Sequence, residues 1–327
     1  YEGEIGANVR EAWKLIDDPN PVTIAVIDSG CDMTHEDLSE NLITDLAYDA
    51  VAEQVDGVEL GDNSGHGTHV AGIAGAVVDN GKGVAGASDN MAKILPINVF
   101  SGSYASTDSI IKAMNYLDKL MANGTLKDLH VINMSLGGYE AEEGDEALFE
   151  CIDYMRKKDV LTVCAGGNGN YNNIAYGPEK TIFPGDYEGC LCVAALDSEG
   201  NHTRFSDYNS FKDISAPGDN IYSTTMGSNY GFMSGTSMAS PLVAGIASML
   251  WAQDQNITVD QAIESIQKTA HPVNRAKYDR TGKTGSAGAI DAAAALEYAE
   301  LNYDSSRIKI DEAKITLSQV EFTYTGQ

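Results

Sequence analysis

Three polar residues that lie far apart in the chain have the side chains that can activate a serine for attack on a carbonyl carbon. Asp28 lies in Val-Ile-Asp-Ser-Gly, His66 lies in Gly-His-Gly-Thr-His, and Ser237 lies in Gly-Thr-Ser-Met-Ala. A serine hydroxyl is protonated at neutral pH, so an imidazole must remove its proton, and a carboxylate must hold that imidazole in one tautomer. We therefore predict Ser237 as nucleophile, His66 as general base and acid, and Asp28 as the orienting group.

Asn168 follows an apolar run and two glycines in the segment Ala-Gly-Gly-Asn. The negative charge that develops on an attacked carbonyl oxygen needs hydrogen-bond donors aimed at it. We expect the Asn168 side-chain amide to donate to this oxyanion together with the backbone N–H of Ser237. The alternative is an asparagine that only tolerates the left-handed conformation of a turn.

Together these motifs resemble those of the subtilisin-like serine proteases (subtilases) of the secreted bacterial type. The order Asp, His, Ser and the Ala-Gly-Gly-Asn turn both match, and similar segments extend from Trp13 to about Tyr298. The resemblance implies a secreted or cell-surface endopeptidase that cleaves protein or peptide substrates through an acyl-enzyme. It also implies a precursor with a signal peptide and an inhibitory N-terminal propeptide. Leu242 replaces a histidine usual in the family, but that histidine is outside the triad.

The resemblance also indicates where an extended substrate binds. Backbone pairing with a substrate strand recognises main-chain groups more than side chains, which suits an endopeptidase of broad specificity. The expected substrate-binding residues form two edge segments and the walls and base of the S1 pocket: Ser101, Gly102, Ser103, Ser135, Leu136, Gly137, Ala165, Gly166, Gly167 and Ile182.

Ile182 precedes the Phe183-Pro184 dipeptide, which matches a cis peptide of the family. Relatives with a deep S1 slot have glycine at the position of Ile182. A β-branched side chain there would fill part of the slot, so we predict a preference for Leu, Met or Ala at P1 over Phe or Tyr. In the alternative, Ile182 points into the core and S1 stays deep.

A structural calcium ion is the cofactor that the resemblance implies, and the chemistry itself requires none. Asp37 matches a calcium-binding aspartate of the family, and Asp79 lies in the loop that completes that site. Calcium takes about six to eight oxygen ligands, and the loop here is glycine-rich and of a different length. The sequence leaves open whether calcium is bound.

The composition excludes some classes of partner. The 327 residues carry 21 Lys and Arg against 48 Asp and Glu, a net charge of −27 that would repel nucleic acid and anionic lipid. No apolar run approaches the ~18 residues of a membrane span. Five cysteines are an odd number, so at least one is unpaired within the chain, and Cys164 and Cys192 are predicted to be buried.

Apolar runs alternate with helical patterns along the chain, which predicts an α/β fold with a doubly wound, mostly parallel sheet and helices on both faces. We expect strands at 22–27, 94–100, 131–134, 160–165 and 190–195, and helices at 69–78, 107–121, 145–157, 238–251, 259–269 and 292–298. Residues 1–302 form the predicted catalytic domain. Residues 303–327 alternate like a short β segment, either the start of an immunoglobulin-like repeat or a strand pair that packs back.

Two other function classes are weighed against the endopeptidase. A catalytically silent subtilase fold could serve as an adhesive or scaffold module at a cell surface, which the C-terminal β segment permits. A complete triad with Asn168 argues against it. A lipase or esterase would need a Gly-x-Ser-x-Gly turn, whereas Ser237 lies in Gly-Thr-Ser-Met-Ala.

Overall fold

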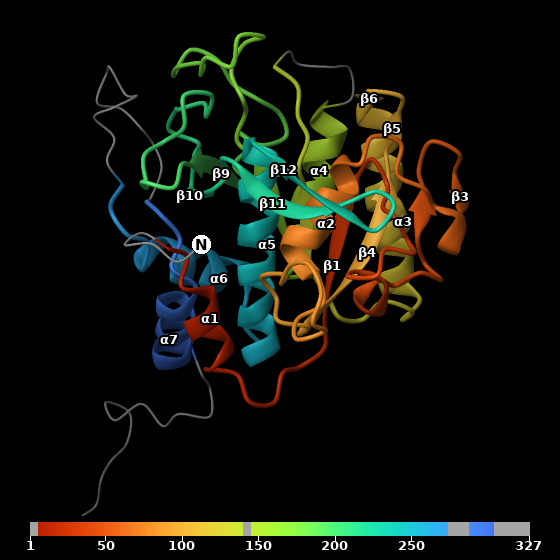
Figure 1. Ribbon diagram of the computed structural model, residues 1–327, viewed down its shortest axis with the longest axis horizontal. Helices are drawn as coiled ribbons and strands as arrows, with labels where there is room; N and C mark the ends of the chain where they lie inside the picture. Colours follow the sequence, from red (N-terminus) through yellow and green to blue (C-terminus); the bar gives the residue numbers. More distant parts are fainter. Residues whose placement is uncertain (1–5, 140–144, 274–287, 304–327) are drawn as a thin grey trace, which may run out of the picture.

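The fold is described from a computed structural model, in which the helices surround a central sheet (Figure 1). This sheet has eight strands in the part of the chain described. The structure describes residues 6–139, 145–273 and 288–303. Neighbouring strands are parallel except β2 and β3, which are antiparallel. In spatial order the strands are β10 (Ile214–Pro217), β9 (Cys190–Leu196), β8 (Leu161–Ala165), β7 (Leu129–Met134), β1 (Val22–Asp28), β4 (Ala92–Asn98), β2 (Tyr48–Asp49) and β3 (Gln54–Val55).

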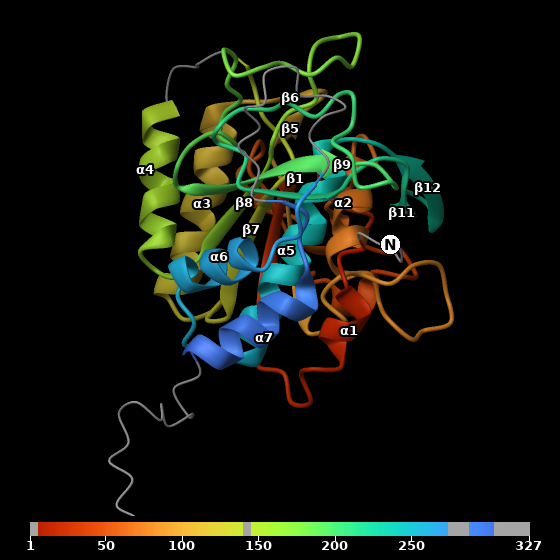
Figure 2. The same ribbon diagram turned by 90° about the vertical axis from the view of Figure 1, so that its left-hand side faces the viewer.

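Helices cover both faces of this sheet (Figure 2). The first face carries α1 (Val9–Trp13), α2 (His66–Gly75), α5 (Thr236–Gln253), α6 (Val259–Lys268) and α7 (Ala292–Tyr303), and the second carries α3 (Thr107–Ala122) and α4 (Asp145–Arg156). The predicted doubly wound α/β fold is therefore confirmed. Each face has its own apolar cluster, so a central strand must be apolar on both sides.

Strand β1 shows why a nearly continuous apolar run marks this fold. All seven of its residues are buried, and it lies between β4 and β7 in the middle of the sheet. Full burial of a side chain such as Ile24 contributes about 1.5–3 kcal/mol relative to exposure. The carboxyl end of this strand is consequently a rigid place for Asp28.

Helix α5 crosses the first face with 16 of its 18 residues buried. It packs against β7, β8, β9 and β10 and against helix α2. A helix that is apolar all round is one enclosed by protein. Its N-terminus reaches the edge of the sheet where the parallel strands end, and this brings Ser237 to that edge.

Several short elements were not predicted from the sequence. They are the antiparallel pairs β5 (Phe100–Ser101) with β6 (Tyr104–Ala105) and β11 (Ile221–Thr225) with β12 (Asn229–Met233), besides α1, β2, β3, β10 and two single turns at Ser39–Asn41 and Gly57–Glu59. Helix α2 begins at His66 rather than at residue 69, and β4 ends at Asn98 rather than at residue 100. Helix α7 continues to Tyr303, and residues 304–327 of the predicted β segment lie outside the described residues.

None of the helices in the described ranges has the length and apolar character that crossing a bilayer takes. All five cysteines are free thiols, and Cys164 and Cys192 are buried as predicted. Burial raises the pKa of both thiols well above the ordinary value, so they stay protonated inside the sheet.

Candidate active site

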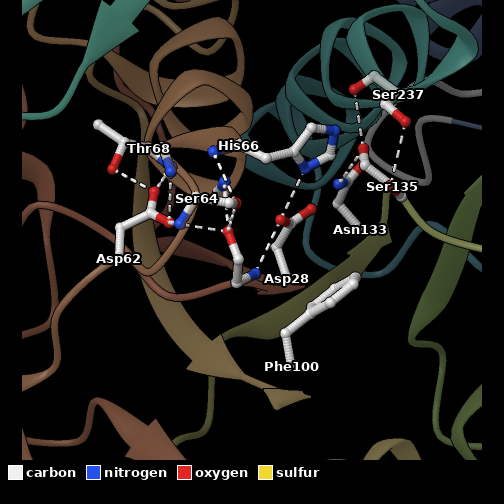
Figure 3. A network of polar contacts seen from close by, with 12 residues as sticks. Asp28, Asp62, Ser64, His66, Thr68, Phe100, Asn133, Ser135 and Ser237 are labelled. Carbon is white, nitrogen blue, oxygen red and sulfur yellow. Dashed lines mark hydrogen bonds and ion pairs between the residues drawn. The ribbon is translucent and has the colours of Figure 1, made fainter. Parts of the chain in front are cut away.

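Asp28 and His66 meet where β1 ends and α2 begins (Figure 3). The Oδ1 atom of Asp28 accepts a hydrogen bond from Nδ1 of His66 at 2.7 Å and from the backbone N–H of Ser29 at 2.8 Å. Gly67 permits this approach, because a Cβ atom there would lie 2.1 Å from the carbonyl oxygen of Gly30. The carboxylate therefore holds Nδ1 as the N–H and leaves Nε2 of His66 as the proton acceptor.

The pKa of His66 reflects two opposing effects. Burial alone would lower this pKa, but the attraction and hydrogen bond of Asp28, with a smaller contribution from Asp62, raise it above the ordinary histidine value. Asp28 is fully buried, so water screens this attraction little. An imidazole stabilised in its charged form is a stronger base for the proton that it must take.

Ser237 lies in the first turn of α5, with the His66 ring between it and Asp28 in Figure 3. Its hydroxyl donates to the carbonyl oxygen of Ser135 at 3.1 Å, and the Ser135 hydroxyl donates back to the carbonyl oxygen of Ser237 at 2.9 Å. The Ser237 hydroxyl therefore points to the segment expected to bind substrate. Contacts between nucleophile and base often tighten only when substrate binds.

Asn168 is oriented by the residue that precedes the nucleophile. Its Oδ1 atom accepts hydrogen bonds from the backbone N–H of Thr236 at 2.8 Å and from the Thr236 hydroxyl at 3.0 Å. The same hydroxyl accepts from the backbone N–H of Gly167 at 3.1 Å. Holding the amide oxygen in this way directs Nδ2 to the other side, where it can donate to an oxyanion beside Ser237.

The structure brings most of the expected substrate-binding residues to one edge of the sheet. Residues 135–137 directly follow β7, and residues 165–167 end β8 and turn away from it. Residues 101–103 end β5 and form the turn to β6. A cavity of about 160 Å³ lies between the first and third of these segments, and Ser103, Leu136 and Gly137 are among its lining residues. The Phe183-Pro184 peptide is cis, as the resemblance implies.

The side chain of Ile182 lies against the segment expected to form one wall of S1. Its Cδ1 and Cγ1 atoms are both 2.9 Å from the position that a Cβ atom of Gly137 would take, and its Cγ2 atom is 3.5 Å from the corresponding position at Gly185. Ile182 is 5% exposed, and it belongs to neither of the two large apolar clusters of the described residues. This position favours the filled slot over the alternative in which Ile182 joins the core.

A profile of the Subtilase family matches residues 20–292. The chain belongs to the subtilase family. The Thermophilic serine proteinase of Bacillus sp. (strain AK1) is 35% identical over 286 residues, which are 85% of this chain and 64% of the relative. Thermitase of Thermoactinomyces vulgaris is 32% identical over 290 residues, which are 88% of this chain and 92% of the relative. A solved structure described as proteases from Pseudoalteromonas arctica has a TM-score of 0.74 and 27% identity, covering 91% of this chain and 96% of that one.

Membership of this family makes the subtilase a serine endopeptidase. The second histidine of the His-Gly-Thr-His segment, His69, has a packing role. His69 is buried, its Nε2 atom faces the carbonyl oxygens of Ile221 and Gly231, and burial lowers its pKa to about 4. It is therefore neutral at physiological pH and contributes to holding the β11–β12 hairpin on α2.

Asp37, which the sequence predicts as a calcium ligand, accepts two hydrogen bonds in this subtilase. Oδ1 of Asp37 accepts a hydrogen bond from Nδ2 of Asn80 at 2.6 Å, and Oδ2 accepts from the backbone N–H of Val84 at 2.9 Å. Within the described residues neither Asp37 nor Asp79 belongs to a group of three or more His, Cys, Asp or Glu side chains that could hold a metal ion. Calcium takes about six to eight oxygen ligands, and each oxygen of Asp37 accepts one N–H hydrogen bond here. We therefore derive no step through calcium.

Sequence reasoning missed Asp62, which organises the turn before His66 (Figure 3). Its Oδ1 accepts from the Ser29 hydroxyl at 2.8 Å and from two backbone N–H groups, those of Ser64 and Gly65. Its Oδ2 accepts from the backbone N–H and the hydroxyl of Thr68. The segment Asp-Asn-Ser-Gly before a helix is typical of a carboxylate that caps orphan N–H groups, and this signal could have identified it.

Proposed function

We propose that this subtilase hydrolyses peptide bonds of extended protein or peptide substrates through a covalent acyl-enzyme on Ser237. The observation that carries the proposal is the 2.7 Å hydrogen bond that fixes His66 on buried Asp28. On the other side of the His66 ring lies Ser237, at the N-terminus of α5 (Figure 3). Backbone N–H groups at a helix N-terminus favour negative charge, so this position suits an attacking serine.

In the proposed reaction His66 takes the proton of the Ser237 hydroxyl through Nε2 while the oxygen attacks the substrate carbonyl carbon. Nδ2 of Asn168 and the backbone N–H of Ser237 receive the oxyanion, and Asp28 stabilises the imidazolium. His66 then gives its proton to the leaving amine. Water attacks the acyl-enzyme with the same base, which releases the acid product and restores Ser237.

Further features of the proposal rest on the family. We infer a secreted or cell-surface enzyme made with an N-terminal propeptide that inhibits it before maturation, and a catalytic domain that ends near residue 302. The net charge of −27 supports a highly solvated enzyme without affinity for nucleic acid. Ile182 in the S1 slot supports a preference for Leu, Met or Ala at P1.

The direct experiment compares Ser237→Ala with Ser234→Ala. Ser237→Ala should lose peptide hydrolysis and labelling by a fluorophosphonate while its circular dichroism stays that of wild type, with residual catalysis of roughly 10³-fold over water. Ser234 is exposed three residues earlier and is the matched control, so its replacement should leave both readouts unchanged. Turnover of Ser237→Ala close to wild type would refute the triad. A wild type that resists the label would instead indicate a silent scaffold module.

A further inference from the structure

The main chain of the Asn168 turn is held by a tyrosine from another part of the chain. The Tyr139 hydroxyl oxygen accepts hydrogen bonds from the backbone N–H of Asn168 and from that of Gly169, both at 2.9 Å. The same hydroxyl donates to Oδ2 of Asp207 at 2.7 Å. One O–H donor and two acceptor sites are all that a phenol offers, so its capacity is fully used.

Asp207 anchors this tyrosine from inside the protein. It is 2% exposed, its Oδ1 accepts from the backbone N–H of Tyr176 at 2.6 Å, and its own backbone N–H donates to the carbonyl oxygen of Gly167 at 3.1 Å. Burial raises the pKa of the Tyr139 phenol, and the hydrogen bond to Asp207 acts in the same direction, so the phenol keeps the proton that it donates. The pair is therefore a fixed donor and acceptor at neutral pH.

No side chain separates this pair from the turn. Gly167 has φ +101°, and a Cβ atom there would lie 2.1 Å from Oδ2 of Asp207 and 2.9 Å from the Tyr139 hydroxyl oxygen. Only glycine allows this backbone conformation and this approach together. Residues 167, 168 and 169 are thus each bonded to one member of the pair.

The ring of Tyr139 is also fixed. It packs edge-on against Tyr176 with ring centroids 4.9 Å apart, and Nζ of Lys180 lies 5.9 Å from the centroids of both rings. Tyr139 directly follows Gly138, which exchanges two backbone hydrogen bonds of 2.9 Å with Phe183. The hydroxyl is consequently positioned by the same segment that forms the expected substrate edge.

We propose that Tyr139, supported by Asp207, is a positioning residue for catalysis, which acts by fixing the main chain that carries the oxyanion donor Asn168. The inference rests on the proposed function. Thr236 holds the amide oxygen of Asn168, and Tyr139 holds its backbone, so two separate contacts define where Nδ2 points. A donor aimed at the transition state loses effect when its position shifts by a fraction of an ångström.

The test replaces Tyr139 by phenylalanine, which keeps the ring and removes the hydroxyl. We expect kcat to fall about 10- to 100-fold with KM changed by less than about twofold, because the oxyanion exists only in the transition state. Tyr176→Phe is the matched control. It removes from the neighbouring ring a hydroxyl that has no hydrogen bond among the described residues, and should leave kcat unchanged.

Two further measurements separate positioning from a general structural role. In an Asn168→Ala background, Tyr139→Phe should change kcat by less than about twofold, because the donor that it positions is already gone. Amide hydrogen exchange at residues 168 and 169 should be faster in Tyr139→Phe than in wild type or Tyr176→Phe.

A wild-type kcat in Tyr139→Phe, or the same loss with and without Asn168, would overturn the inference while the proposed function stands. A wild type without hydrolysis that depends on Ser237 would refute the proposed function and this inference with it.

Discussion

Replacing Ile182 by glycine tests whether this side chain limits the S1 slot. Two atoms of Ile182 lie 2.9 Å from the position of a Cβ atom on Gly137, which means that the side chain contacts the backbone of the substrate edge. A phenylalanine ring at P1 would have to displace it. Overpacking of this kind costs about 1–3 kcal/mol, which corresponds to about a 5- to 150-fold loss in kcat/KM for Phe.

The assay measures kcat/KM for one peptide series that differs only in P1, with Phe, Leu and Ala. The ratio of Phe to Ala should rise by about 5- to 150-fold from wild type to Ile182→Gly, with an intermediate rise in Ile182→Val. Because Ile182 is 5% exposed, truncating it also costs about 2–5 kcal/mol of unfolding free energy. All rates are therefore measured well below the melting temperature of the variant.

The ratio of kcat/KM for the Phe and Ala peptides is taken within one variant. It does not depend on the stability of that variant, since both peptides are cleaved by the same folded fraction of the enzyme. If wild type already gives Phe or Tyr the highest kcat/KM, or if the ratio does not change in Ile182→Gly, the slot is not limited by this side chain.

Three further predictions concern the oxyanion, the base and the C-terminal boundary. Asn168→Ala should lower kcat by about 10²–10³-fold with little change in KM, the loss known for the corresponding donor of subtilisin in the same family, and an effect confined to KM would contradict the oxyanion role. Because His66 must be neutral to accept a proton and Asp28 raises its pKa, kcat/KM should rise with pH through an apparent pKa above about 6.5. In Asp28→Asn, His66 stays buried but loses the attraction of the carboxylate, so its pKa should fall and the acidic limb of the kcat/KM profile should move to lower pH. A limb that stays in place would refute His66 as the base that Asp28 supports. Truncation after Tyr303, whose hydroxyl donates to Glu264 at 2.9 Å, should leave kcat/KM at the wild-type value, and loss of folding would place the later residues in the catalytic domain.

Most of the sheet could be predicted because its central strands are buried on both faces. Runs such as Cys190–Leu196 are apolar throughout, and the predicted bounds of β1, β8 and β9 agree with the structure within one residue. The start of α2 was misplaced since its first turn depends on Asp62, whose carboxylate caps N–H groups that periodicity does not show. The β11–β12 hairpin was missed because it buries polar residues such as Ser223 and Thr224 against α2 and exposes apolar ones such as Phe232.

The candidate site divides in a similar way. Asp28, His66, Ser237 and Asn168 carry motifs long enough to be found in the sequence alone. Their supporting contacts are pairings between distant segments, such as Tyr139 with Asp207, 68 residues apart. No local pattern encodes such a pair, because either residue alone is typical of a loop. Calcium binding at Asp37 stays a prediction, and the local sequence likewise does not show that this carboxylate accepts from Asn80 and Val84.

The enclosure of α5 has a consequence for an enzyme surrounded by copies of itself. A protease cleaves segments that can leave their fold and extend across its cleft, and a helix with 16 of 18 residues buried cannot do so alone. Releasing it would separate it from six strands, β1, β4, β7, β8, β9 and β10, and from α2, which amounts to opening the whole molecule. During self-digestion, the time for which Ser237 stays active is therefore set by the rate or extent of global unfolding. Cleavage of surface loops leaves α5 and Ser237 in place.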